Sequence, residues 1–86
     1  MNNLTLLYVE DEIQTIQSID FYLKRLFKDV FISQDGEEAL RLFSENKPDV
    51  IILDISNPKM DSLKVASNIR EQNSEIPIIC VTAHSD

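Results

Sequence analysis

Four short apolar runs recur along the chain, and the segments between them carry helical patterns. The runs cover residues 4–9, 30–32, 50–53 and 78–82, and the third is purely aliphatic. Runs this short, rich in β-branched residues and without regular alternation, suit strands that are buried on both faces of a parallel sheet. Strands that alternate with helices through short connections favour right-handed crossovers. The fold class predicted is therefore α/β with a parallel sheet.

Three helices are predicted between the runs, over residues 12–27, 37–43 and 62–73. Lys24 and Arg25 lie near the end of the first helix, as the helix dipole prefers, and Pro48 ends the second. The residues expected to face the sheet are Ile16, Ile19, Leu23 and Leu26 in the first helix and Leu63, Ala66 and Ile69 in the third.

The totals limit the kind of protein. The 86 residues make one domain at most, and no apolar run approaches the roughly 18 residues of a membrane span. The N-terminus has no basic flank before its apolar stretch, so no secretory signal is expected and a cytoplasmic location follows. Cys80 is the single cysteine, which excludes an internal disulfide, and its apolar neighbours predict a buried small hydrophobic residue.

Charge and glycine content exclude several functions. The formal net charge is −7, from 15 acidic and 8 basic residues, which argues against direct binding of nucleic acid. Gly36 is the only glycine, and neither a P-loop nor a dinucleotide-binding fingerprint can be made from one glycine.

Acidic side chains follow the predicted strands at their carboxyl ends. Glu10 and Asp11 follow the first strand, Asp54 follows the third, and Thr82 ends the fourth. In an open parallel sheet these ends share one edge, where ligands bind. Carboxylates gathered there repel one another, and a hard cation such as Mg²⁺ relieves the repulsion. The alternative for each single acid is a helix N-cap.

Five motifs in order resemble the receiver domain of two-component response regulators. They are LYVEDE at 7–12, DGEEAL at 35–40, PDVIILD at 48–54, PKMD at 58–61, and IPII at 76–79 with VTA at 81–83. The resemblance covers essentially the whole chain, residues 1–86. It implies a flavodoxin-like sheet of strand order 2-1-3-4, without the family's fifth strand and last helices.

The resemblance also implies roles for particular residues. Asp54 matches the phosphoacceptor, which takes a phosphoryl group from a sensor histidine kinase, and the domain is a signalling module rather than an enzyme. Asp11 matches the direct ligand of Mg²⁺, Glu10 the acid that acts through water, and the Ser56 carbonyl completes the ion's shell. Thr82 matches the hydroxyl that hydrogen-bonds the phosphoryl group and moves with it.

The chain departs from the family pattern in three ways. Asn57 stands where an apolar residue is usual and Ser62 where glycine is usual; if that position needs positive φ, Ser62 strains the loop after Asp54. The family's lysine has no match, since Lys59 and Lys64 are expected to be surface residues. Without a fifth strand, residues 78–81 form an apolar sheet edge, which predicts self-association.

Two other functions stay open. A receiver-like interaction or oligomerisation module would keep the acids but take little or no phosphate, because the family lysine is absent. A Mg²⁺-dependent phosphatase would need acid/base and substrate-capping features that the sequence does not display. The single histidine, His84, is assigned no role and is expected to be a solvated loop residue.

Overall fold

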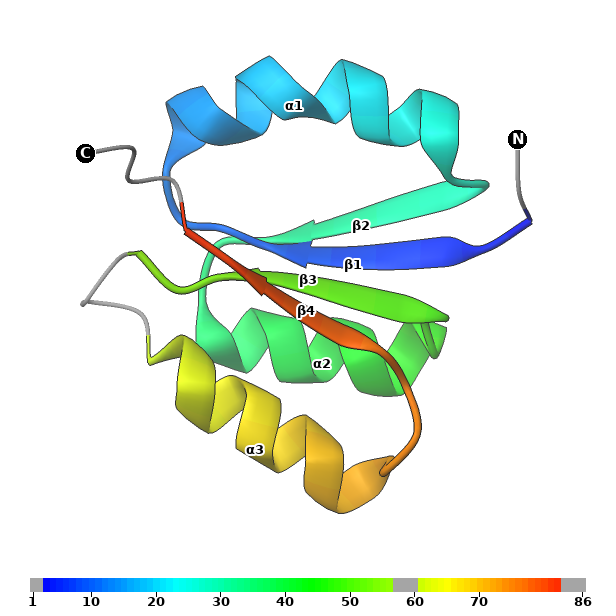
Figure 1. Cartoon of the computed structure of the whole chain (residues 1–86), viewed down its shortest axis with the longest axis vertical. Coiled ribbons are helices and arrows are strands. Elements are labelled where there is room, and N and C mark those ends of the chain that lie inside the picture. Colours follow the sequence, from blue (N-terminus) through cyan, green and yellow to red (C-terminus); the bar gives the residue numbers. More distant parts are fainter. Residues whose placement is uncertain (1–2, 57–60, 83–86) are drawn as a thin grey trace.

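The computed structural model describes residues 3–56 and 61–82, and over these residues strands and helices alternate strictly (Figure 1). In chain order the elements are β1 (Thr5–Val9), α1 (Ile13–Leu26), β2 (Asp29–Ser33), α2 (Gly36–Asn46), β3 (Val50–Asp54), α3 (Ser62–Gln72) and β4 (Ile78–Val81). The predicted helices and strands are all present, and their ends agree with the prediction to within three residues. No helix in this part of the chain is long and apolar enough to cross a membrane.

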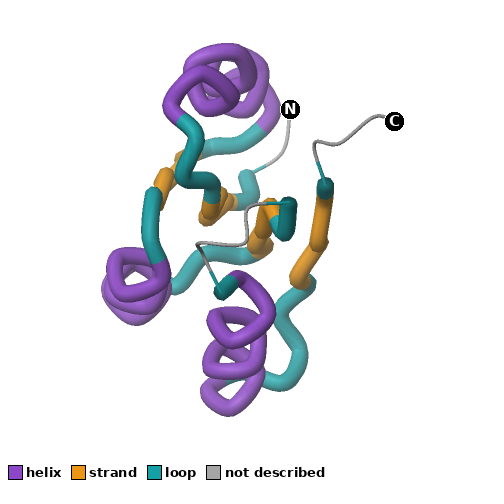
Figure 2. Tube along the Cα trace, turned by 90° about the vertical axis from the view of Figure 1, so that its left-hand side faces the viewer, coloured by secondary structure: helices purple, strands orange, loops and turns teal. Residues whose placement is uncertain are grey.

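The four described strands form one parallel sheet of order β2-β1-β3-β4, which confirms the predicted order. Helix α1 covers one face of the sheet, and α2 and α3 cover the other (Figures 1 and 2). The chain order reverses between β1 and β3, because β1 has β2 on one side and β3 on the other. All the carboxyl ends therefore lie along one edge.

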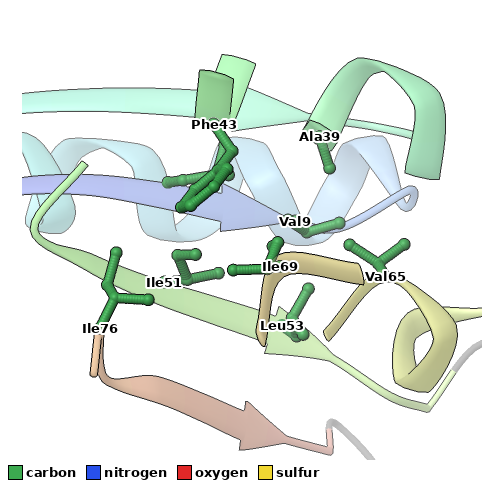
Figure 3. Packing of buried hydrophobic residues seen from close by; sticks show 9 residues of the cluster. Val9, Ala39, Phe43, Ile51, Leu53, Val65, Ile69 and Ile76 are labelled. Atoms are coloured by element: carbon green, nitrogen blue, oxygen red, sulfur yellow. The ribbon is translucent and has the colours of Figure 1, made fainter. Parts of the chain in front are cut away.

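The sheet is buried between two apolar clusters, because successive side chains of a strand point to opposite faces. Toward α2 and α3, Leu7 and Val9 of β1 and Ile51 and Leu53 of β3 are fully buried against Ala39, Phe43, Val65, Ile69 and Ile76 (Figure 3). Toward α1, Leu6 and Tyr8 pack with Leu23 and Val50. Each fully buried aliphatic side chain stabilises the fold by about 1.5–3 kcal/mol. The burial of β1 and β3 therefore fixes the positions of the acidic residues at their carboxyl ends.

Helix α2 shows how local chemistry sets its ends. Asp35 is the N-cap, and its Oδ1 accepts a hydrogen bond of 2.8 Å from the backbone N–H of Glu38. The C-cap is Lys47, in the left-handed region with φ 47°, directly before Pro48. Pro48 cannot continue a helix and disfavours helical backbone at the residue before it, so the predicted stop is confirmed.

Three burial predictions were wrong. Leu26 is 56% exposed and is the last residue of α1, one turn beyond the buried Leu23. Leu63 is 66% exposed, and the buried face of α3 is formed by Ser62, Val65 and Ile69 instead. Cys80 is exposed, because β4 lies at the edge of the sheet and pairs only with β3 among the described strands. Asn57, Lys59 and His84 lie outside the described residues.

Candidate functional site

The ends of β1, β3 and β4 bring the predicted site residues to one edge of the sheet. Val9 pairs with Leu53, and Asp54 pairs with Val81. Asp54 is therefore the last residue of β3, and Glu10 and Thr82 follow the neighbouring strands β1 and β4 at similar height. Glu10 is 3% exposed and Asp54 4% exposed, whereas Asp11 is half-buried and Thr82 is exposed. Two of the predicted carboxylates are therefore buried at the carboxyl edge.

Glu10 is held by three neighbours. Its Oε1 accepts from the Tyr8 hydroxyl at 3.4 Å, its Oε2 accepts from the Glu12 backbone N–H at 3.1 Å, and the side chain of Asp54 lies beside it. Burial raises the pKa of Glu10 to about 7, the side chain and charge of Asp54 and the charge of Asp11 add to the rise, and the Glu12 N–H opposes it. The raised pKa leaves Glu10 partly protonated near neutrality.

The same electrostatics affect Tyr8. Burial raises the pKa of its hydroxyl to about 12, and the negative charges of Glu10 and Asp54 add to the rise. Tyr8 is only 3% exposed and lies two residues before Glu10 on β1, so its hydroxyl points along the strand toward the acids. Tyr8 therefore stays protonated and serves as a hydrogen-bond donor to the site.

Asp54 is held both by its side chain and by its backbone. Its Oδ1 accepts from the backbone N–H of Ser56 at 2.7 Å and from the Ser56 hydroxyl at 2.5 Å. Its backbone carbonyl accepts from the Ser62 hydroxyl at 2.8 Å. The strain suggested for Ser62 is absent, because Ser62 is the first residue of α3 and Lys47 is the non-glycine residue with positive φ in the described part.

The capping alternative applies to other acids. Asp35 caps α2, and Asp61 caps α3 by accepting from the backbone N–H of Lys64 at 3.2 Å. Glu12 stands at the N-cap position of α1 without a side-chain capping bond. Glu10 and Asp54 lie at strand ends and cap no helix, so capping does not explain their burial.

The oxygen donors suit a hard cation, although no ready-made cage is present. Among residues 3–56 and 61–82, no group of three or more His, Cys, Asp or Glu side chains is arranged to hold a metal ion. Mg²⁺ commonly takes only one or two protein carboxylates and keeps several waters, so it does not need such a cage. Two neighbouring buried carboxyl groups form the kind of donor set that a divalent cation stabilises. The predicted ligands Glu10, Asp11, Asp54 and Ser56 thus fit the ion by chemistry.

A groove of about 460 Å³ adjoins this edge and was not predicted. Asp11 lies in its wall, together with residues from the first turns of α2 and α3, including Asp35, Glu37, Asp61 and Lys64. The motif at 35–40 indicated that a helix begins there with several acidic residues. The groove could not be predicted from it, because the groove forms only where α2 and α3 lie side by side. Lys64 is exposed, as expected.

The parallel sheet, the reversal of strand order and the buried acids at the carboxyl edge together define a small α/β domain with an acidic site at its switch point. Residues 6–86 match the model of the response regulator receiver domain, and the chain belongs to that family.

Three relatives illustrate the likeness. The alkaline phosphatase synthesis transcriptional regulatory protein PhoP of Bacillus subtilis is 37% identical over 84 residues, which cover 98% of this chain and 35% of PhoP. The chemotaxis response regulator CheY4 of Vibrio cholerae is 28% identical with a TM-score of 0.83, over 99% of this chain and 72% of CheY4.

The response regulator TrrA, solved in complex with the histidine kinase ThkA, is 32% identical with a TM-score of 0.82, over 96% of this chain and 72% of that one. These neighbours confirm the predicted flavodoxin-like receiver fold. The chain spans about a third of the length of the curated relatives that it matches.

Proposed function

We propose that this chain is the phosphoacceptor module of a two-component system and that Asp54 receives the phosphoryl group. The observation that carries the proposal is the buried carboxyl pair of Glu10 and Asp54 at the carboxyl edge of the sheet, with Asp11 beside it. Burial of two acids costs stability, and buried acids with perturbed pKa values cluster at functional sites. Thr82, at the end of β4, is proposed to hydrogen-bond the phosphoryl group and to move with it.

Phosphoryl transfer depends mainly on positioning the Asp54 carboxylate and the phosphoryl group and on stabilising negative charge. No residue other than Asp54 needs to form a covalent bond. A carboxylate oxygen of Asp54 attacks phosphorus, the bond from phosphorus to the donor's nitrogen breaks, and the donor imidazole leaves with a proton. The product is an acyl phosphate on Asp54. The Ser56 N–H and hydroxyl, at 2.7 and 2.5 Å, hold Oδ1 and so restrict the carboxylate to one orientation.

Mg²⁺ would be held by Asp11 and Asp54, by Glu10 through water, and by the backbone carbonyl of Ser56. When bound, it supplies positive charge against the equatorial phosphoryl oxygens. Because burial raises the pKa of Glu10 to about 7, a bound cation would favour its ionised form.

The proposed donor is a phosphohistidine of a sensor histidine kinase. TrrA, a relative of 32% identity, was solved in complex with such a kinase, which supports the same class of partner here. We propose that the chain meets this kinase in the cytoplasm. Direct contact with nucleic acid is not proposed for this chain, because its net charge is −7.

A second candidate is a receiver-like module for interaction and oligomerisation that takes little phosphate. It is favoured by β4, whose outer edge is unpaired among the described strands and whose Ile79 is 48% exposed. An edge of this kind is a template for another strand, so self-association is proposed alongside the phosphoacceptor role.

Mass measurement separates the two candidates. Incubation with acetyl phosphate and Mg²⁺ is expected to add one phosphoryl mass to the intact protein, with little or none when Mg²⁺ is chelated. Asp54→Asn is nearly isosteric and cannot form an acyl phosphate, so it should show no adduct. Absence of an adduct on the folded parent protein would favour the interaction module, and an adduct on Asp54→Asn would place the chemistry elsewhere.

A further inference from the structure

Ser62 is a buried polar residue with one well-defined partner. It is 3% exposed at the first position of α3, and its hydroxyl donates to the backbone carbonyl of Asp54 at 2.8 Å. Asp54 is also buried, so water does not compete for this bond. Receiver domains usually have glycine at this position, and glycine offers no donor, so the contact depends on the serine of this chain.

The peptide unit that follows Asp54 is held at both ends. Its carbonyl accepts from Ser62 of α3, and its N–H, which belongs to Ile55, donates to the Val81 carbonyl of β4 at 2.8 Å. A peptide unit is planar, so bonds at its two ends fix its orientation. The Cα of Asp54 is bonded directly to this plane, and the direction of the Asp54 side chain is restricted as a result.

The start of α3 does not depend on Ser62 for capping. Asp61 is the N-cap, and its Oδ1 accepts from the backbone N–H of Lys64 at 3.2 Å. Val65 and Ile69 of α3 are buried in the core. Loss of the Ser62 hydroxyl therefore removes the bond to Asp54 while the cap and the packing of the helix stay in place.

We propose that Ser62 is a positioning residue for the phosphoacceptor, acting through the clamped peptide unit between Asp54 and Ile55. The clamp joins α3, the phosphoacceptor and the end of β4 that leads into Thr82. The clamp restricts the backbone of Asp54, and the two hydrogen bonds from Ser56 to Oδ1 restrict its side chain. Together these contacts fix the orientation of the carboxylate. The inference rests on the proposed function, since it assigns Ser62 a part in the same transfer.

The test compares phosphorylation rates at several acetyl phosphate concentrations with Mg²⁺ present. Small displacements of a reacting group reduce rates strongly, so Ser62→Ala is expected to lower the plateau rate about tenfold while the half-saturating donor concentration changes less than about twofold. Ser62→Thr keeps a hydroxyl and should restore most of the rate. Ser67→Ala is the matched control, because Ser67 is an exposed serine on the same helix.

Several outcomes would overturn the proposal. A folded Ser62→Ala that reacts at the parent rate, or a folded Ser62→Thr as slow as the alanine variant, would do so. If circular dichroism shows that Ser62→Ala does not fold, Ser62→Cys takes its place, since a thiol is nearly the same size but a weak donor; a parent-like rate there would also count against the clamp.

A separate measurement distinguishes failure of this inference from failure of the phosphoacceptor proposal. Amide hydrogen exchange reports the Ile55 N–H whether or not Asp54 reacts. Faster exchange at Ile55 in Ser62→Ala than in Ser67→Ala is expected, and equal exchange would refute the clamp. A parent protein that forms no adduct, with exchange at Ile55 still altered, would refute the proposed function alone.

Discussion

Glu10 is an acidic residue in a buried environment. Its carboxyl group is buried beside Asp54, and its pKa is raised to about 7 chiefly by burial. In the unfolded chain the same group titrates near 4.5. The folded state therefore binds this proton more tightly, and folding is favoured by protonation of Glu10 and opposed by its ionisation.

The sign of the pH dependence follows from these two values. The contribution of Glu10 to stability is fully present below about pH 4.5 and is lost as pH rises through about 7. Glu10→Gln keeps the shape without the charge, so at pH 8, with divalent cations chelated, the variant should be more stable than the parent by about 1–3 kcal/mol. Urea denaturation at pH 5 and pH 8 measures this. A difference between variant and parent that is the same at both pH values would contradict the assignment.

The start of helix α2 depends on a single side chain, that of Asp35. Asp35 caps α2, and the first turn of that helix lines the groove next to Asp11. Ser33, the last residue of β2, also contacts the cap residue, because its hydroxyl donates to the Asp35 carbonyl at 2.6 Å. The strand β2 and the helix α2 are thus joined by a short, hydrogen-bonded connection.

Removal of the cap should destabilise the domain in a way that its near-isostere does not. Asp35→Ala loses the bond to the Glu38 N–H and is expected to lower the free energy of unfolding by about 1 kcal/mol. Asp35→Asn keeps a capping oxygen and should stay within a few tenths of the parent. Thermal or urea unfolding of both variants decides this, and equal losses in the two would show that the cap is not the cause.

The elements also show what the sequence could and could not predict. The order of helices and strands followed from apolar runs and helical spacing, and Asp54 and Glu10 followed from the rule that carboxyl ends share an edge. The bond from Ser62 to Asp54 could not be predicted, because it depends on how closely the start of α3 packs against the end of β3. Exposure of Cys80 was missed for a related reason, since an apolar run does not reveal that its strand lies at the edge of the sheet.

At the scale of the whole molecule, the sheet is covered unevenly. Ile79 and Val81 of β4 pair with Ile52 and Asp54 of β3, so they point to the face that α1 occupies. Helix α1 contacts β2 and packs on β1 through Leu23, and Ile79 and Val81 remain exposed. The described part of the chain therefore combines an unpaired strand edge with apolar side chains beside it.

This combination leads to the prediction that copies of the chain associate through β4. Pairing of two β4 strands about a two-fold axis satisfies backbone groups of both edges and covers Ile79 of both copies. Size-exclusion chromatography with light scattering should give a mass that rises with protein concentration, and Ile79→Lys should shift it to the monomer because a charge on the edge opposes pairing. Leu63→Lys is the matched control, since Leu63 is exposed on α3, which lies on the opposite face of the sheet. A monomeric parent at micromolar concentration, or equal effects of the two lysines, would exclude β4 as the contact.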